Sequence, residues 1–494
     1  MRTKNMLGIA YLYVLLPFFI FLLGWCRWYV AAPGAVILVY CFFRMMKNLP
    51  ELWEPMWTPG EREKMVFIFL LIVFWVYFSG VGKLVFQNTD HDWRNAIFEA
   101  LVNHSWPAAK AVQIDGTVSN HALVYYIGFW MPSALVGKLL GMDAGYCFQA
   151  VWAVIGVFCV YYFVCVIRKE IAVWPLLIFI FISGLDAVPA YVIGGGENLR
   201  DITAHLEWWP NTGLQYSAMT TQLFWVFNQA VPAWLLILLL YLQKNNRQMI
   251  LLLSCAMLTS TIPFVGMFPF AAYFMLRRFG GKDSAGEKIK MFLADTVTAE
   301  NVLGGGMVGI LSFLYLKGNI SGQNTRMIAD ADGPKAYLFI WITFVLFEVG
   351  VYWIAIYKYQ KKNVLFYIIC AWLCICPWIK VGSGPDFCMR ASIPALVLLY
   401  LLVVETLEKS WKGKDYLVLG GLAVLLLIGS VTPVHEFNRT IAETANRAHA
   451  HKYIFAPTVS EEELFTADNF WGDMESSFFF RYIAKQGIEK NLSD

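Results

Sequence analysis

Two aspartates flank a histidine directly after an apolar run, in the segment Gln87-Asn88-Thr89-Asp90-His91-Asp92-Trp93-Arg94. A carboxylate that is shielded by lipid and aromatic side chains can have a raised pKa and take a proton from an attacking hydroxyl. Two carboxylates at this spacing can also bind Mg²⁺ or Mn²⁺ through their oxygens. Asp90 and Asp92 are therefore candidate catalytic residues and possible metal ligands. The structural alternative is that Asp90 caps a surface helix and pairs with Arg94 one turn later.

A second polar segment runs from residue 194 to residue 222 and contains five ionisable side chains and a pair of tryptophans. Aromatic rings stack on the faces of sugars, while carboxylates and amides bind hydroxyl groups. The candidates for sugar or acceptor binding are Glu197, Asp201, Glu207, Trp208, Trp209, Gln215 and Tyr216. The alternative is an interfacial aromatic belt with solvated charges. Asn, Gln and Thr continue into the next apolar run, where they are unfavourable unless they line a cavity.

A third segment, residues 380–390, carries Lys380 at its beginning and Arg390 at its end. A lysine and an arginine at the edge of a membrane can bind a lipid phosphate. The alternative is that both side chains extend toward lipid headgroups without a specific ligand.

The elements that position these residues are membrane helices. Only 15% of the 494 residues are charged, against about 25% in a typical soluble domain, and 59% are hydrophobic. Apolar runs of the length needed to cross a bilayer recur along the chain. The sequence predicts an all-α polytopic membrane protein with thirteen spans, at residues 6–25, 29–43, 65–84, 146–167, 172–190, 222–242, 248–261, 264–277, 300–316, 336–357, 364–379, 391–407 and 416–432. The net charge of +3 is spread thinly, which gives no reason to expect a nucleic-acid partner.

The placement of basic residues decides how residues 121–140 are interpreted. If this segment lies along the outer face, the later short loops place fifteen Lys and Arg inside and six outside. If it spans, the two numbers are exchanged, which breaks the positive-inside rule. Pro132 also favours a broken segment. We therefore predict interfacial or re-entrant helix for residues 121–140, within a first outer loop that carries interfacial helices.

This arrangement predicts a multi-pass protein of the cell membrane with a cytoplasmic N-terminus and an extracytoplasmic C-terminus. Residues 1–432 form the transmembrane domain, and residues 433–494 form an extracytoplasmic tail. The predicted outer loops are residues 85–145, 191–221, 317–335 and 380–390. All three candidate segments therefore lie on the same side of the bilayer.

The pattern resembles the GT-C superfamily of membrane glycosyltransferases, most clearly over residues 85–235. In that superfamily an acidic residue opens the first long outer loop, as Asp90 or Asp92 does here. A later helix of that loop starts near Leu123-Val124-Tyr125-Tyr126 and ends in Lys138-Leu139-Leu140-Gly141. The chain lacks the Trp-Trp-Asp signature of oligosaccharyltransferases, and Trp208-Trp209-Pro210 does not replace it.

The resemblance implies transfer of a sugar from a polyprenyl-phosphate donor to a hydroxyl of a glycan, lipid or protein acceptor, with inversion. It implies Asp90 as the base, with Asp92 as the second candidate or a metal ligand. The expected donor-phosphate ligands are Arg390, Lys380, Arg200 and His205. The alternatives are a lipid-linked glycan flippase or other transporter, a polysaccharide polymerase or ligase, and a non-catalytic scaffold.

Overall fold

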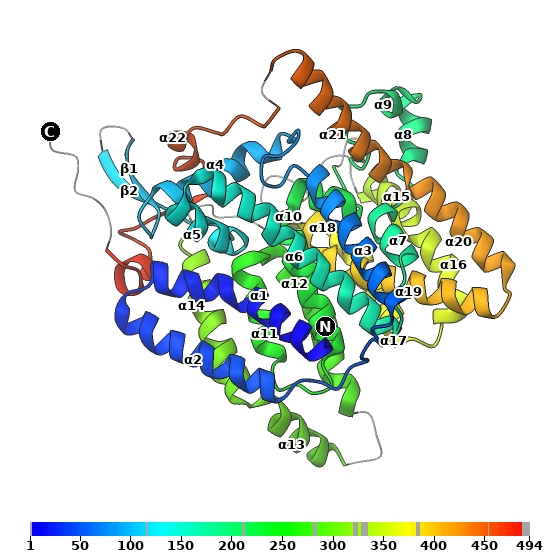
Figure 1. Cartoon of the computed structure of the whole chain (residues 1–494), viewed down its shortest axis with the longest axis horizontal. Helices are drawn as coiled ribbons and strands as arrows, with labels where there is room; N and C mark the ends of the chain where they lie inside the picture. Colours follow the sequence, from blue (N-terminus) through cyan, green and yellow to red (C-terminus); the bar gives the residue numbers. More distant parts are fainter. Residues whose placement is uncertain are drawn as a thin grey trace.

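The apolar runs form helices throughout the computed structural model, which describes residues 2–114, 117–209, 213–279, 284–319, 325–327, 334–381, 386–452 and 454–486. Figure 1 labels the helices α1 (Thr3–Trp25), α2 (Trp28–Lys47), α3 (Pro59–Phe78), α4 (Asp90–Asn103), α5 (Met131–Leu140), α6 (Met142–Arg168), α7 (Trp174–Phe181), α8 (Ala187–Gly194), α9 (Glu197–Arg200), α10 (Met219–Leu242), α11 (Met249–Thr259), α12 (Thr261–Leu276), α13 (Ala285–Thr296), α14 (Gly306–Leu316), α15 (Pro334–Val345), α16 (Val351–Gln360), α17 (Val364–Ile375), α18 (Asp386–Ala391), α19 (Ile393–Lys412), α20 (Tyr416–Gly429), α21 (Val431–His449) and α22 (Glu461–Leu464). Short 3₁₀ or π turns join some of them: η1 (Ile127–Trp130), η2 (Arg277–Phe279), η3 (Glu300–Gly305), η4 (Leu346–Gly350), η5 (Cys376–Trp378) and η6 (Phe479–Ile483).

Six helices among the described residues are long and apolar enough to cross a membrane: Thr3–Trp25, Trp28–Lys47, Met142–Arg168, Met219–Leu242, Tyr337–Gln360 and Tyr416–His449. A seventh candidate is the pair Ala285–Thr296 and Glu300–Leu316, which is bent by 66°. The chain is therefore a multi-pass, mainly helical membrane protein. The most deeply buried of the six is α10, with 94% of its apolar window inside the protein.

Each of the thirteen predicted spans contains a helix, but several of these helices are shorter than a bilayer crossing. At a rise of about 1.5 Å per residue, the eight residues of α7 and the eleven of α11 cannot cross about 30 Å of hydrocarbon alone. In the 172–190 segment the helix stops before Ser183-Gly184-Leu185-Asp186. Thirteen crossings therefore remain a prediction, whereas membrane-spanning helices are present.

The first predicted outer loop contains a β-hairpin that the sequence analysis missed. Strand β1 (Ala109–Ile114) pairs antiparallel with β2 (Thr117–Leu123), and β5 (Trp471–Asp473) adds a third strand. The Asp-Gly dipeptide between β1 and β2 is a strong sequence signal for a two-residue hairpin turn. The prediction of helices alone in this loop was wrong, and the first part of the 121–140 segment is strand. After a short connection, Ile127–Leu140 forms a helix that is too short to span.

The predicted tail is continuous with the membrane helices. Tyr416–His449 forms one long helical unit, so no break in the structure falls at residue 433. Farther along, β5 joins the hairpin, and Ala484 forms a β-bridge with Cys26 at the end of α1. The described part of the tail is thus built into one end of the helix bundle.

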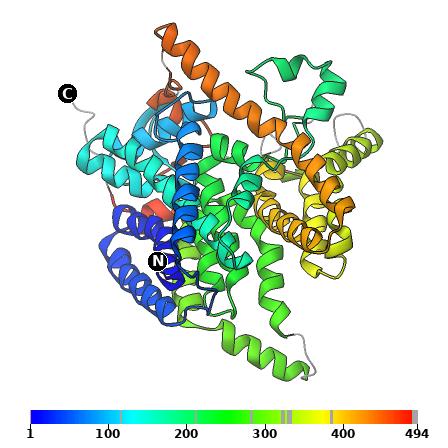
Figure 2. The same ribbon diagram turned by 45° about the vertical axis from the view of Figure 1, so that its right-hand side comes forward.

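The connecting segments between helices form two groups, which are named here the α4 end and the α13 end. At the α4 end, Phe470 O accepts from Val124 N, and Thr444 Oγ1 accepts from Phe86 N. At the α13 end, Thr298 Oγ1 donates to Arg247 O at 2.5 Å. Figure 1 shows α13 at the lower edge, α21 at the upper edge and the β1–β2 hairpin at the upper left, and Figure 2 again shows α13 and α21 at opposite edges. The predicted outer loops contribute to the α4 end and the predicted inner loops to the α13 end.

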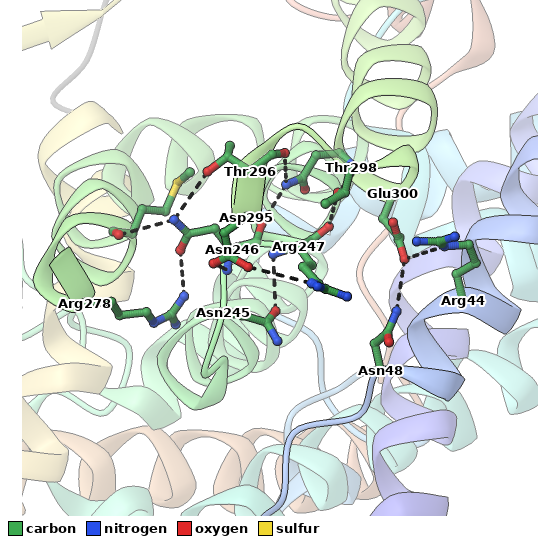
Figure 3. Close-up of polar contacts among 12 residues, drawn as sticks. Arg44, Asn48, Asn245, Asn246, Arg247, Arg278, Asp295, Thr296, Thr298 and Glu300 are labelled. Atoms are coloured by element: carbon green, nitrogen blue, oxygen red, sulfur yellow. Dashed lines mark hydrogen bonds and ion pairs between the residues drawn. The ribbon is translucent and has the colours of Figure 1, made fainter. Parts of the chain in front are cut away.

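A dense polar network holds the α13 end together (Figure 3). Asn246 accepts from Arg278 Nη1 at 2.6 Å, and its backbone N donates to Asp295 Oδ2 at 2.7 Å. Glu300, which is buried, accepts from Arg44 Nε at 3.0 Å. Because these bonds join α2, the α10–α11 connection, η2 and the bend of the bent pair, they fix the helix ends against one another.

Candidate active site

The start of α4 is fixed against a break in α10. Val226 has non-helical backbone angles, with φ −133° and ψ 34°, which interrupt the hydrogen-bond ladder of α10. The nearby carbonyl of Phe224 accepts from Asn88 Nδ2 at 2.8 Å and lies 3.0 Å from His91 Nε2. His91 is fully buried, so the histidine between the two aspartates positions the helix and is not available to a substrate. The aspartates on either side of it face different surroundings.

Asp90 interacts with two guanidinium groups. Arg94 Nη2 is 2.8 Å from Asp90 Oδ2, and Arg390 interacts electrostatically with the same carboxylate. Burial alone would raise the pKa of Asp90, but Arg94 and Arg390 hold it below its ordinary value. Asp90 is therefore ionised at neutral pH, and 43% of its side chain remains exposed. The i,i+4 pair with Arg94 expected from the structural alternative is present and is part of the site.

The pKa of Asp92 is shifted in the opposite direction. Burial and the neighbouring Asp90 raise its pKa, and Arg447 opposes the shift. One of its carboxylate oxygens is buried and accepts no hydrogen bond from any described residue. The raised pKa that the sequence analysis expected thus belongs to Asp92 and not to Asp90.

Arg94 is buried, the side chain of Arg390 is 13% exposed, and both keep uncommitted N–H groups. Arg390 Nη1 donates to Tyr126 Oη at 2.8 Å, and its Nη2 is 3.4 Å from Asp386 Oδ2. Arg94 Nε donates to Asn228 Oδ1 at 3.4 Å. The remaining atoms, Arg94 Nη1 and Arg390 Nε, have no hydrogen-bond partner among the described residues. Buried guanidinium groups with free donors suit an oxyanion ligand such as a phosphate.

The loop after α9 is fixed from inside by a buried glutamate, Glu207. Glu207 is fully buried and accepts from Ala218 N at 2.7 Å, Thr221 Oγ1 at 2.8 Å and Gln215 Nε2 at 2.9 Å. Burial, with buried Asp186 nearby, raises the pKa of Glu207 to about 8. Tyr216 is also buried and donates to the carbonyl of Leu373. Glu207, Gln215 and Tyr216 therefore shape the loop from inside, and their polar atoms are already used by the protein.

His205 connects the same loop to α21. Its Nδ1 lies 3.7 Å from Glu436 Oε1, and Glu436 Oε2 accepts from Trp225 Nε1 at 2.8 Å. Arg439 forms an ion pair with the same carboxylate. Burial lowers the pKa of His205, but Glu436 outweighs burial and raises it overall. His205 therefore pairs with a carboxylate, and the sequence analysis missed Glu436 and Arg439 because it treated the tail as a separate unit.

The two tryptophans of the loop differ. Trp209 is buried, and its Nε1 donates to Glu348 Oε1 at 2.7 Å. Trp208 is 63% exposed. A small cavity of about 30 Å³ adjoins Glu348 and Ser183, which is room for water. Of the pair, Trp208 is the side chain that a ligand can reach.

The other predicted ligands lie apart from Asp90 or at the surface. Glu197, Arg200 and Asp201 are exposed on or next to α9. Lys380 is half-buried in β4 (Ile379–Val381), where it pairs in register with Arg326 of β3 (Thr325–Met327). The structure thus brings together Asp90, Asp92 and Arg390, adds Arg94 and Tyr126, and does not join the remaining predicted ligands to them by direct contacts among the described residues.

The loop that contains Glu207 nevertheless contacts the helix that carries Arg390. Cys388 Sγ lies 3.7 Å from Gln215 O, while the amide of Gln215 donates to Glu207. Asp90, Arg390 and Glu207 therefore belong to one continuous region around the first half of α10.

The donor set around Asp90 does not favour a divalent cation. No group of three or more His, Cys, Asp or Glu side chains within the described ranges is arranged to hold a metal ion. Asp90 is committed to Arg94, and a second guanidinium lies within electrostatic reach. Positive charge at this position repels a cation and attracts an anion.

Comparison of the chain with protein-family models, with curated proteins and with solved structures gives no match.

Proposed function

We propose that this membrane protein is a glycosyltransferase that moves a sugar from a polyprenyl-phosphate donor to an acceptor hydroxyl, with inversion. The observation that carries the proposal is the ionised Asp90, which is paired with Arg94 and under the electrostatic influence of Arg390. Transfer from a lipid phosphate needs a base for the acceptor proton and positive charge for the departing phosphate. This arrangement supplies both at one end of a helix bundle that spans the bilayer.

In the proposed reaction, the acceptor oxygen attacks the anomeric carbon while the bond from that carbon to the phosphate oxygen breaks. The acceptor proton passes to the Asp90 carboxylate. The electron pair of the broken bond stays with the lipid phosphate, which Arg390 Nε and Arg94 Nη1 stabilise. Because the leaving group is a phosphate, the reaction needs no general acid.

The loop between α9 and α10 has a positioning role in this proposal. Glu207 holds Ala218 and Thr221 at the start of α10, and α10 in turn holds α4 through Phe224. Trp208, which is exposed on the same loop, is the aromatic ring best placed to meet a sugar. Asp92 is the second candidate for the base.

A second candidate function is movement of a lipid-linked glycan across the bilayer without chemistry. Buried acids support it: Glu348 lies within the span Tyr337–Gln360 and is 2% exposed, and Asp186 beside it is 1% exposed. Ionisable residues inside a membrane often mark a transport path. The same reconstituted system distinguishes the two functions, because a transporter releases no polyprenyl phosphate.

The test uses the purified full-length protein in vesicles with a panel of polyprenyl-phosphate sugars and a lipid and glycan extract as acceptor. Mass spectrometry measures polyprenyl phosphate and the glycosylated product. We expect Asp90→Asn to lower transfer by about 10²-fold or more, since a positioned base contributes 10² to 10⁴-fold. Asp143→Asn, at an exposed aspartate beginning α6, is the matched control and keeps full activity. Full transfer by both Asp90→Asn and Asp92→Asn would show that neither carboxylate is the base.

A further inference from the structure

An open groove separate from Asp90 lies at the α4 end, between the end of α14 and the segment that follows β5. Its volume is about 530 Å³, within the range of small-ligand sites. It is lined by Leu314, Lys317, Gly318, Asn319, Asp473, Ser476, Ser477 and Phe478. The groove therefore has an apolar wall and a polar floor.

Two glycines create the floor by allowing two backbones to touch. A Cβ on Gly472 would collide with the carbonyl of Gly318, and a Cβ on Gly318 would lie 2.7 Å from Ser477 Oγ. The residues next to these glycines, Lys317 and Asp473, therefore extend from opposite segments of the contact. This places a cation and an anion on the same groove.

Neither charge is neutralised by an ion pair. Among the described residues Lys317 forms no salt bridge. Asp473 accepts from the turn N–H groups of Glu475 at 3.0 Å and Ser476 at 3.2 Å, and it also interacts with the Ser476 side chain and electrostatically with His121. Burial opposes ionisation of Asp473, but these hydrogen bonds and the nearby His121 hold its pKa below the ordinary value. The hydroxyl of Ser477, which is 9% exposed, has no described partner. Lys317, Asp473 and Ser477 are thus available to a ligand that carries both charges.

The surroundings place the groove at the level of lipid headgroups. α14 is the end of the bent membrane-helix pair, and Lys317 follows its last residue. Phe313, Phe478 and Tyr482 expose more than half of their side chains, as aromatic residues do at the membrane interface. A ligand in the groove can therefore keep its polar end on Lys317 and Asp473 and its apolar end against Leu314 and Phe478.

We propose that this groove binds a phospholipid whose headgroup carries a primary amine, as in phosphatidylethanolamine. Lys317 and the Ser477 hydroxyl bind the phosphate, and Asp473 accepts hydrogen bonds from the ammonium group. A choline headgroup has no N–H to donate to Asp473. A purely anionic headgroup would place negative charge against it.

The test measures which lipids stay bound to the purified protein in native mass spectra. The protein is incubated with an equimolar series in which the amine carries zero to three methyl groups, from phosphatidylethanolamine to phosphatidylcholine, plus phosphatidylglycerol. We expect retention of the ethanolamine lipid to exceed that of the choline lipid about tenfold, with a stepwise decrease along the series. Because this measurement uses the unmodified chain, it does not depend on a variant that folds. Equal retention across the series would overturn the proposal.

Variants locate the site. Asp473→Asn should abolish the preference for the amine, while Asp468→Asn, at an exposed aspartate five residues earlier, should keep it. Lys317→Ala should lower retention of every phospholipid, while Lys412→Ala at the α13 end should not. If Asp468→Asn removes the preference, or if Asp473→Asn leaves it intact, the groove is not the binding site. None of these readouts depends on sugar transfer, so they stand apart from the proposed function.

Discussion

Trp209 and Glu348 are joined by a 2.7 Å hydrogen bond from the indole Nε1 to Oε1. The bond links the loop before α10 to the π-helical turn η4, inside a helix that spans the membrane. Asp186 also contacts Glu348, and Gly184 packs so closely on the Glu348 carboxyl that a Cβ there would collide with it. One buried acid therefore holds together three segments that are distant in the sequence.

Trp209→Phe should destabilise the protein. The substitution leaves Glu348 Oε1 buried without its donor, which costs about 1–3 kcal/mol. Thermal unfolding in detergent measures the change. Unfolding is monitored by the reaction of cysteine thiols that are buried in the folded protein. Trp208→Phe is the matched control because its side chain is 63% exposed, and it should change stability little. Equal stability of the two variants would mean that the indole bond contributes nothing.

Glu207 should make stability depend on pH. Burial raises its pKa to about 8 in the folded state, above the ordinary value of 4.5 in the unfolded chain. Between these two values the folded protein binds a proton that the unfolded chain releases, so stability falls as pH rises through this window. The slope is at most about 1.4 kcal/mol per pH unit from this group. His205, whose pKa is also raised, contributes in the same direction above its ordinary value of 6.5.

Unfolding midpoints measured from pH 5 to pH 9 check this prediction. Glu207→Gln keeps an oxygen for Ala218 and Thr221 and cannot ionise, so the decrease in stability from pH 5 to pH 6.5 should become smaller, while Asp92, whose pKa is also raised, keeps its own contribution. Glu462→Gln, at an exposed glutamate, should leave the decrease unchanged. A decrease of the same size in Glu207→Gln and in the unmodified protein would contradict the assignment.

The sequence predicted the presence of helices better than their lengths. Apolar runs report burial in lipid or protein, which is why each predicted span contains a helix. They do not report where a helix breaks, and the polar stretch Ser183–Asp186 ends α7 early. The β1–β2 hairpin was missed because its signal is alternation around Asp-Gly, which runs of apolar residues do not report.

The candidate site was predicted in part for a similar reason. Asp90 and Arg390 are 300 positions apart in the sequence, and only the charge distribution across the membrane placed them on the same side. Tertiary pairs such as His205 with Glu436 have no local signal. The sequence also could not show that Glu207 faces inward, because an acid beside two tryptophans looks the same in a loop that binds sugar and in a loop that packs on itself.

Tyr126→Phe should weaken the proposed transfer without abolishing it. The hydroxyl accepts from Arg390 Nη1 at 2.8 Å and orients the guanidinium. Loss of one such bond corresponds to about 1–1.4 kcal/mol, or a five- to tenfold decrease in kcat/KM for the lipid donor. Tyr191→Phe, at a residue 64% exposed on α8, is the control and should retain full activity. Unchanged kcat/KM in Tyr126→Phe would show that Arg390 needs no support from this hydroxyl.

Asn301 should be a main support of the α13 end. Its Oδ1 accepts from Ile250 N at 2.9 Å, and its Nδ2 donates to Asn246 O at 2.7 Å and to Thr296 O at 2.8 Å. Asn301→Ala removes these bonds, and a longer one from Leu251 N at 3.4 Å, from a buried position, so we expect a loss of about 2–4 kcal/mol. Chemical unfolding in mixed micelles measures it. Asn245→Ala, which removes one exposed bond to Arg247 N, should lose less than about 1 kcal/mol. Similar losses for the two variants would contradict the supporting role.

The α4 end should face the extracytoplasmic side. Cys147 is exposed, so the test begins from a Cys147→Ser chain. Trp208→Cys places a thiol at the α4 end, and Lys412→Cys places one at the α13 end, both at exposed positions. In intact cells a membrane-impermeant maleimide should label the first variant, and the second only after the membrane is opened, because the short loops at the α13 end carry the excess of Lys and Arg. The reverse pattern would place Asp90 and Arg390 in the cytoplasm. Donor sugars would then have to be supplied from the inner leaflet.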